Sequence, residues 1–206
     1  MSQRELLQLF PIPVLISKYE KNLSEELEYV KNLEYNLSSQ ETQKIYSKQS
    51  SDTFLLDKPE LKNIREFIDS QINFYVNEIL ECSNKLKITQ SWANITDKGK
   101  KHHEHRHPNS IVSGVFYFQI NKTLPPIEFR NKNNEMYSFT IKNHNNFNAE
   151  TFLLPLETGE LILFPSTLYH GVPENVSTTP RISLAFNTFE TESLGKIESL
   201  TYLPLK

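Results

Sequence analysis

The stretch that decides the fold is KHHEHRHPNSIVSGVFYFQI, residues 101–120. Its first half is polar and contains four of the six histidines in the chain, and its second half is an apolar run. Branched and aromatic residues in a run of this length are typical of a buried strand. The stretch therefore predicts a core strand that begins directly after a cluster of potential metal ligands.

Short apolar runs continue on both sides of this stretch, separated by turn residues such as those of Pro125-Pro126 and Thr158-Gly159. The predicted strands cover residues 88–95, 111–120, 127–130, 136–141, 151–154, 161–164, 170–172 and 181–186. Many short strands at this spacing favour a sandwich or a jelly-roll barrel over a parallel sheet.

Two amphipathic helices are predicted ahead of the strands. The first covers residues 24–37, with Ser24 as its N-cap and acidic residues in its first turn, where the helix dipole favours negative charge. The second covers residues 57–82 and has Pro59 in its first turn. The polar segment 38–51 between them is predicted to be a loop. Because each helix is apolar on one side only, we expect both to cover a sheet.

The chain is predicted to form one domain of 206 residues. Its parts are a helical support region (1–86), a jelly-roll core (87–190) and a C-terminal tail (191–206). Within the first part, residues 9–16 are interrupted by two prolines and predict an edge strand or an extended arm.

The composition is that of a globular protein: 37% of the residues are hydrophobic and the net charge is -3. This charge does not favour general nucleic-acid binding, which needs a basic face. The single cysteine, Cys82, cannot form an intramolecular disulfide, and we expect it to be a small buried residue of the second helix. No apolar stretch resembles a signal peptide or a membrane span, so we expect a cytoplasmic protein, in a bacterium or a phage-infected cell.

His105 and His107 are two residues apart, and in an extended chain such residues project to the same face. Pro108 favours extended geometry at His107. A third ligand is expected from a neighbouring strand, and His170 follows the apolar run 161–164. Imidazole suits iron, zinc, copper and nickel, so these ligands predict a transition-metal site without naming the metal.

Other interpretations of the cluster stay open. A solvated, histidine-rich loop is the plainest one, but its position beside a strand and the distal His170 favour a metal site. His103 has the same parity as His105, so a His103/His105 pair is the alternative pair of ligands. Glu104 is expected on the opposite face, and Glu128 is a remote carboxylate candidate.

Arg181 opens the last predicted strand, and Ser183 lies two residues further on the same face. A guanidinium binds a carboxylate through two parallel hydrogen bonds, and a neighbouring hydroxyl can add a third. This pair predicts an anchor for an acidic ligand. Asn94 and Tyr117 are weaker candidates for residues that line the same pocket.

Taken together, HRHPNS at 105–110, SGVFY at 113–117, GELILFPSTLYH at 159–170 and RISLAFN at 181–187 resemble the Fe(II)- and 2-oxoglutarate-dependent oxygenases. More narrowly, their order and spacing are similar to a subgroup of such oxygenases found in bacteria and phages. The resemblance covers residues 92–187.

The resemblance implies a double-stranded β-helix that holds Fe(II), with 2-oxoglutarate on the metal and O2 as second co-substrate. His105 and His170 match the two histidine ligands of the superfamily, and Arg181 with Ser183 would bind the far carboxylate of 2-oxoglutarate. His107 stands where the superfamily usually has an acid. Three neutral imidazoles would leave the site at +2 rather than +1, so His107 is either the third ligand or lies outside the ligand set.

The resemblance thus implies a dioxygenase, an oxidoreductase that hydroxylates a primary substrate. The competing hypotheses are a cupin-like metal-binding barrel without oxygenase chemistry, acting as a binding or interaction module, and a structural protein whose histidines lie in a loop. Metal content and the effect of Arg181→Ala separate the three.

Overall fold

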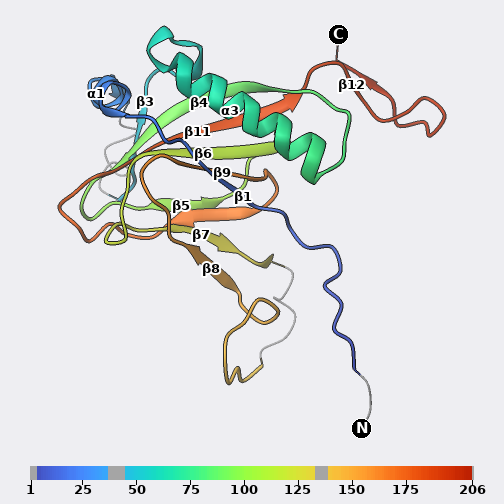
Figure 1. The fold of residues 1–206 in the computed structure, drawn as a ribbon. Helices are drawn as coiled ribbons and strands as arrows, with labels where there is room; N and C mark the ends of the chain where they lie inside the picture. Colours follow the sequence, from blue (N-terminus) through green and yellow to red (C-terminus); the bar gives the residue numbers. More distant parts are fainter. Residues whose placement is uncertain (1–3, 37–44, 133–138, 206) are drawn as a thin grey trace.

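The computed structural model describes residues 4–36, 45–132 and 139–205. Its main feature is a pair of antiparallel sheets packed face to face (Figure 1). The larger sheet has the order β1 (Leu15–Lys18), β9 (Glu160–Pro165), β6 (Val112–Gln119), β11 (Arg181–Glu190), β4 (Leu86–Thr96), β3 (Lys48–Ser50) and β2 (Tyr35–Asn36). The smaller sheet has the order β5 (His102–His105), β10 (Tyr169–Val172), β7 (Ile127–Arg130) and β8 (Thr151–Leu154).

Two helices cover the outer face of the larger sheet, α1 (Ser24–Lys31) and α3 (Lys62–Phe74). Short helical turns flank α3: η1 (Leu55–Asp57) and η2 (Pro59–Leu61) precede it, and the π-helical turn η3 (Tyr75–Ile79) follows it. A small hairpin of β12 (Ser193–Leu194) and β13 (Leu203–Pro204) lies near the C-terminus. The predicted mainly-β class with two N-terminal helices is confirmed.

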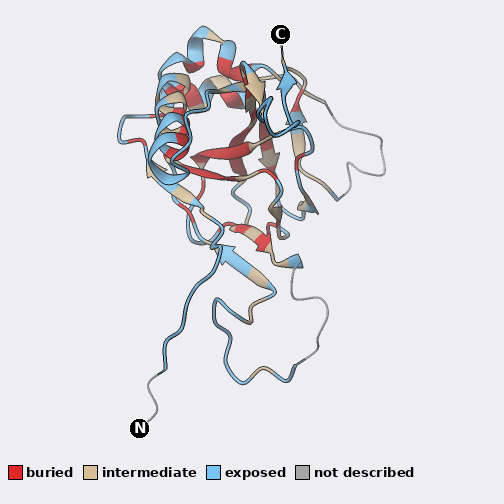
Figure 2. Cartoon of the chain, turned by 90° about the vertical axis from the view of Figure 1, so that its right-hand side faces the viewer, coloured by how far each residue is buried: buried red, intermediate tan, exposed pale blue. Residues whose placement is uncertain are grey.

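The central strands of the larger sheet, β9, β6 and β11, are buried on both faces, because each face has its own core. Along β6, Phe116 and Phe118 pack toward the helices, in a cluster that includes Ile64 and Ile68 of α3. The alternate residues of β6 pack between the two sheets. Burial therefore concentrates in the strands and on the inner sides of the helices (Figure 2).

The helix boundaries differ from those predicted. Helix α1 ends at Lys31, where the side-chain amide of Asn32 donates to the Glu28 carbonyl at 2.9 Å, and residues 35–36 of the predicted helix 24–37 form strand β2 instead. At its start, the side chain of Asn22 rather than that of Ser24 accepts hydrogen bonds, from both the backbone and the hydroxyl of Ser24. The second predicted helix, 57–82, begins as two 3-10 turns and ends in a π turn, and Cys82 beyond it is exposed rather than buried.

The predicted arm is extended and exposed up to β1, which pairs with β9 at the edge of the larger sheet. The predicted loop 38–51 contains strand β3 in its described part. Of the predicted strand 136–141, residues 136–138 lie outside the described residues, and 139–141 are not in a strand. No helix in the described chain is long and apolar enough to cross a membrane.

Candidate metal centre

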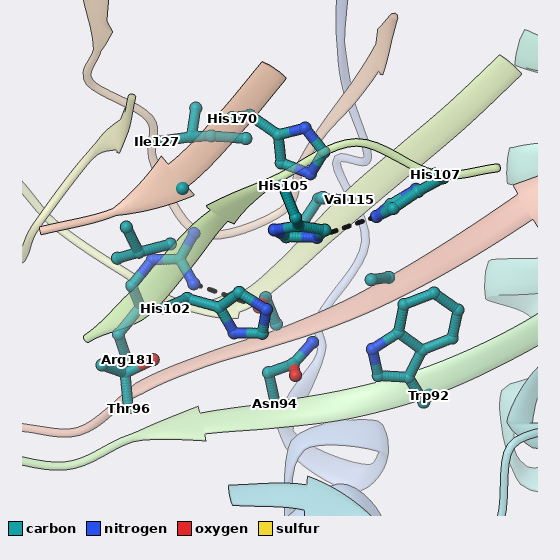
Figure 3. Close-up of a pocket in the computed structure, with 14 residues that line it drawn as sticks. Trp92, Asn94, Thr96, His102, His105, His107, Val115, Ile127, His170 and Arg181 are labelled. Carbon is teal, nitrogen blue, oxygen red and sulfur yellow. Dashed lines mark hydrogen bonds between the residues drawn. The ribbon is translucent and has the colours of Figure 1, made fainter. Parts of the chain in front are cut away.

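Three histidines meet between the two sheets. His105 ends β5, His107 follows it in extended chain, and His170 lies in β10, where it is paired with His105. Their potential ligand atoms all lie within 4.8 Å of one another. His107 and His170 are buried, and His105 is half-buried. Figure 3 shows the three rings pointing toward one another from their separate segments. The structure therefore brings together the three histidines that the sequence predicted as ligands.

Hydrogen bonds at the Nδ1 atoms orient all three rings. His105 Nδ1 donates to the carbonyl of His103 and His170 Nδ1 donates to that of Leu168, each at 2.9 Å. His107 Nδ1 lies 2.7 Å from the Ser113 hydroxyl. A proton on each Nδ1 leaves the lone pair on each Nε2, which is the state that binds a metal.

The hydroxyl of Ser113 lies in a buried polar network that fixes the role of His107. Ser113 donates to Asn187 Oδ1 at 2.9 Å and lies 2.7 Å from the hydroxyl of Ser166. With its own proton used in this way, Ser113 accepts the proton of His107 Nδ1. Asn187, in β11, thus supports the candidate ligand indirectly.

The distance between His105 Nε2 and His107 Nε2 is 3.0 Å. Two lone pairs facing each other at this distance repel unless a cation lies between them. Metal–nitrogen bonds of about 2.1 Å at a right angle place two nitrogens roughly 3.0 Å apart. The spacing therefore fits two neighbouring ligands of one octahedral ion.

Burial keeps these imidazoles neutral. Burial, with a smaller contribution from the nearby His105 ring, lowers the pKa of His170 to about 3. Burial, with a contribution from His105, likewise lowers the pKa of His107 to about 4. The pKa of His105 is also lowered, again mainly by burial. Neutral lone pairs are thus available for a metal well below pH 7.

Neither carboxylate weighed from the sequence takes part. Glu104 points away from the centre and forms ion pairs with Arg130 at 2.9 Å and Lys132 at 2.8 Å. Glu128 pairs with Arg130 at 3.1 Å. In the part of the chain that is described, the only residues grouped as possible ligands are histidines. The donor set at the centre is therefore three neutral imidazoles.

A bulge in β5 changes which other histidine of the strand shares the inner face with His105. His170 is paired with His105 and Val172 with His102, so two residues of β5 stand opposite Gly171 alone. The bulge brings His102 onto the inner face, where it lines the cavity, whereas His103 is exposed. A β-carbon on Gly171 would lie 3.1 Å from the His102 carbonyl, so the close approach of the strands at the bulge favours glycine there. His103 was an alternative ligand because side chains alternate along an extended strand, and this alternation is interrupted at the bulge.

Arg181 lies in the same cavity as a buried cation, 3% exposed. It donates to the Ser183 hydroxyl and to the Tyr117 hydroxyl, each at 3.2 Å, while its Nε is buried without a partner. No carboxylate among the described residues pairs with it. Burial lowers its pKa, but an arginine remains charged. An unpaired buried guanidinium is costly without an anion, so this side chain fits a carboxylate ligand.

A cavity of about 40 Å³ connects the histidines to Arg181. Asn94 lines it, and the Oδ1 atom of Asn94 is buried without a partner, so it is available to a donor on a ligand. Trp92 also lines the cavity and its ring lies edge-on to His107, with centroids 6.0 Å apart. The sequence predicted Asn94 as a residue that lines the pocket, but it did not predict His102 or Ser113. Ser113 carries the parity of Val115 and Tyr117 along β6, and this pattern could have revealed it.

Comparisons with known proteins show what this chain resembles in sequence and in fold. A family model described as "Putative 2OG-Fe(II) oxygenase" matches residues 90–187. None of the curated proteins matches the sequence. Many solved structures do match the fold.

Three of these structures illustrate the likeness. The non-heme alpha ketoglutarate dependent epimerase SnoN from nogalamycin biosynthesis is 10% identical, with a TM-score of 0.65 over 94% of this chain and 86% of its own. A prolyl-4-hydroxylase of Pseudomonas putida is 13% identical, with a TM-score of 0.58 over 86% and 94%. HygX of Streptomyces hygroscopicus, solved with nickel, 2-oxoglutarate and hygromycin B, is 12% identical, with a TM-score of 0.59 over 87% and 84%. The predicted jelly-roll fold and the resemblance to this superfamily are confirmed.

Proposed function

We propose that this chain, which has the fold of the 2-oxoglutarate oxygenases and matches their family model over residues 90–187, is an Fe(II)- and 2-oxoglutarate-dependent dioxygenase. The observation that carries the proposal is one cavity with two complementary ends. Three imidazole lone pairs converge at one end, and an unpaired buried guanidinium lies at the other. A metal ion and a dicarboxylate are the ligands that these two ends require together.

When bound, Fe(II) and 2-oxoglutarate supply the chemistry: with O2 they convert a C–H bond to C–O–H, and 2-oxoglutarate leaves as succinate and CO2. His105, His107 and His170 would hold the ion through their Nε2 atoms on one side. The described residues offer these three ligands at the inner site, so a metal ion held there would have room for exogenous ligands.

The three imidazoles carry no charge, so the protein leaves the full +2 of the ion uncompensated. Three neutral ligands attract the metal ion less strongly than a set that includes one carboxylate. The ion that they hold keeps its full charge and therefore attracts an anionic co-substrate more strongly. We therefore expect metal and 2-oxoglutarate to bind with strong mutual cooperativity.

Arg181 would bind the far carboxylate of 2-oxoglutarate. Ser183 and Tyr117 position the guanidinium from two directions, and its unpartnered Nε is the donor still available for a ligand. The Tyr117 ring also lies under the guanidinium, with the cation 4.9 Å from the ring centroid. These contacts fix the anchor before the ligand arrives, which lowers the entropic cost of binding.

Apolar side chains shield the centre from water. The ring of Phe164 packs against His170 with centroids 4.8 Å apart, and Phe129 lies behind it at 6.3 Å. Val115 and Ile127 line the cavity itself. A dry site strengthens the electrostatic grip of the protein on charged ligands and limits side reactions.

The test is an anaerobic titration of the apo-protein with Fe(II) and 2-oxoglutarate, followed by visible absorption. We expect a charge-transfer band that appears only when both Fe(II) and 2-oxoglutarate are present. The Arg181→Ala variant should still bind the metal but should show no band at 2-oxoglutarate concentrations that produce the band in wild type. His144→Ala, at an exposed histidine outside the site, is the matched control. No band in the folded wild-type protein would refute the proposal.

A cupin-like metal-binding module is the second candidate, because the three histidines are complete without Arg181. The two functions differ in what they consume. The oxygenase takes up O2 and forms succinate when Fe(II) and 2-oxoglutarate are supplied with a substrate, and slowly without one. A binding module does neither, whatever metal it holds.

A further inference from the structure

A second histidine cluster lies beside the metal centre. The potential ligand atoms of His102, His103 and His105 also lie within 4.8 Å of one another. The rings of His102 and His103 are stacked, with centroids 5.1 Å apart and planes 15° apart, and the His105 ring lies 4.9 and 5.0 Å from them. Only His105 of this outer cluster belongs to the inner triad. The other two imidazoles have no role in the proposed reaction.

The imidazoles form a series from solvent to interior. His103 is exposed, His105 is half-buried, and His107 and His170 are buried. A hydrated cation that reaches the inner triad must exchange its waters for protein ligands on the way. A series of neighbouring imidazoles allows this exchange one ligand at a time, so that the ion is never left without ligands.

The outer cluster also joins two cavities. An open pocket of about 340 Å³ lies next to the inner cavity, and His102, Gly171 and Val172 line both. The other residues that line the open pocket are Tyr46, Lys101, His103, Glu104, Glu128, Arg130 and Pro173. Its two carboxylates are balanced by Lys101 and Arg130, so its net charge does not select a cation. The feature that selects a transition metal is the pair of imidazoles at its inner end.

We propose that His102 and His103 form an outer position for a divalent transition-metal ion, with His105 as the ligand shared with the inner triad, and that the ion enters the inner triad through it. The inference rests on the proposed function, because the inner triad is the destination. Since His105 is shared and two dications repel, only one position is filled at a time. Tetrahedral ligands at about 2.1 Å lie roughly 3.4 Å apart, and the candidate ligand atoms of the outer cluster lie within 4.8 Å of one another.

The first experiment measures how fast the apo-protein takes up Co(II), by stopped-flow visible absorption. His103→Ala removes the exposed end of the series, and His144→Ala removes another exposed histidine as a control. We expect the loading and release rates of His103→Ala both to fall at least fivefold, with the dissociation constant within twofold of wild type. A lost route slows both directions equally and leaves the equilibrium unchanged.

Two results of this experiment would overturn the proposal. One is a His103→Ala loading rate equal to that of wild type. The other is a larger dissociation constant that by itself explains the change in the loading and release rates, because His103 would then be a ligand of the final metal site. If the wild-type protein takes up no Co(II), the proposed function itself fails. If wild type loads tightly and His103→Ala loads equally fast, only the entry route fails.

The second experiment isolates the outer position. His170→Ala disables the inner triad, and its fold is checked by near-ultraviolet circular dichroism. We expect this variant to bind one Co(II) more weakly than wild type, and to lose at least tenfold further affinity when His103→Ala is added. Binding that does not change on adding His103→Ala would place the ion on His105 and His107 alone and contradict the outer position.

Discussion

At the scale of single residues, the candidate ligands depend on side chains that never touch the metal. The Ser113 hydroxyl holds the proton of His107 Nδ1 and is itself held by Asn187. In a site without a carboxylate ligand, this contact determines which nitrogen of His107 carries the lone pair. Ser113 is therefore as important to the third ligand as the extended chain that positions it.

We predict that Ser113→Ala weakens metal affinity by about 10- to 100-fold, the usual cost of losing a partner that orients a ligand. Titration calorimetry with Co(II) measures it. Ser110→Ala is the control, because Ser110 belongs to the same hydroxyl network but does not contact His107. Equal metal affinities for Ser113→Ala and wild type would show that the Ser113 hydroxyl does not fix the orientation of the His107 ring.

The sequence predicted His105, His107 and His170 because two rules apply to them directly. Alternation in an extended chain places the first two together, and the third follows a second strand. His102 escaped prediction because a single extra residue in β5 shifts the parity, and a bulge leaves no mark in one sequence. The partners of Arg181 were partly predictable, since Ser183 shares its face along the strand, whereas Tyr117 comes from a neighbouring strand.

At the scale of elements, the positions of the strands were largely readable and their ends less so. Strands β7 and β8 have the predicted bounds, and the other strands that match a predicted run contain it or lie within it: β4, β6, β9, β10 and β11. Among the strands that were not predicted, β3 and β5 are polar and are held by pairing to neighbouring strands rather than by their own composition. A local pattern cannot reveal a strand whose stability comes from its partners.

Gly114 shows how tightly the elements of the larger sheet pack. A β-carbon there would overlap the Phe186 ring of β11 and come within 2.7 Å of Leu163 in β9. We predict that Gly114→Ala destabilises the protein by about 1–3 kcal/mol through overpacking. Urea unfolding measures the change. Adding Phe186→Leu, which shrinks the overlapping ring, should recover part of the loss. A Gly114→Ala variant as stable as wild type would contradict this packing.

At the scale of the whole molecule, the order of strands was the part that the sequence did not reveal. Strand β1 pairs with β9, about 150 residues later in the chain, and β5 joins a different sheet from its predecessor β4. Such long-range pairings depend on how the core of the whole molecule packs, and no pattern in the nearby sequence indicates them. Only the fold class followed from the number and length of the strands.

The imidazoles at and beside the metal centre also make the stability of the metal-free protein depend on pH. The pKa of His102 is lowered to about 3, first by burial and then by the neighbouring His105, and those of His107 and His170 are lowered to about 4 and about 3. In the unfolded chain histidine titrates near pH 6.5. Between about pH 6.5 and 4 the unfolded state therefore binds protons that the native state does not.

We predict that the metal-free protein loses stability as the pH falls through this window, by up to about 1.4 kcal/mol per pH unit for each of the three histidines. Above about pH 7 the stability should be insensitive to these groups. Urea unfolding of the apo-protein at pH 7 and pH 5 tests this, with a variant of the exposed His144, His144→Ala, as the control. Equal stability at the two pH values would mean that the rings are not buried as described.

The central claim is that His105, His107 and His170 bind one ion and Arg181 binds the acid that lies on it. The most direct measurement is an anaerobic crystal structure with Fe(II) and 2-oxoglutarate, using anomalous scattering at the iron edge. The account predicts one iron peak at about 2.1 Å from all three Nε2 atoms, with a carboxylate on the Arg181 guanidinium. An iron peak that lacks any one of the three, or a co-substrate that does not contact Arg181, would contradict it.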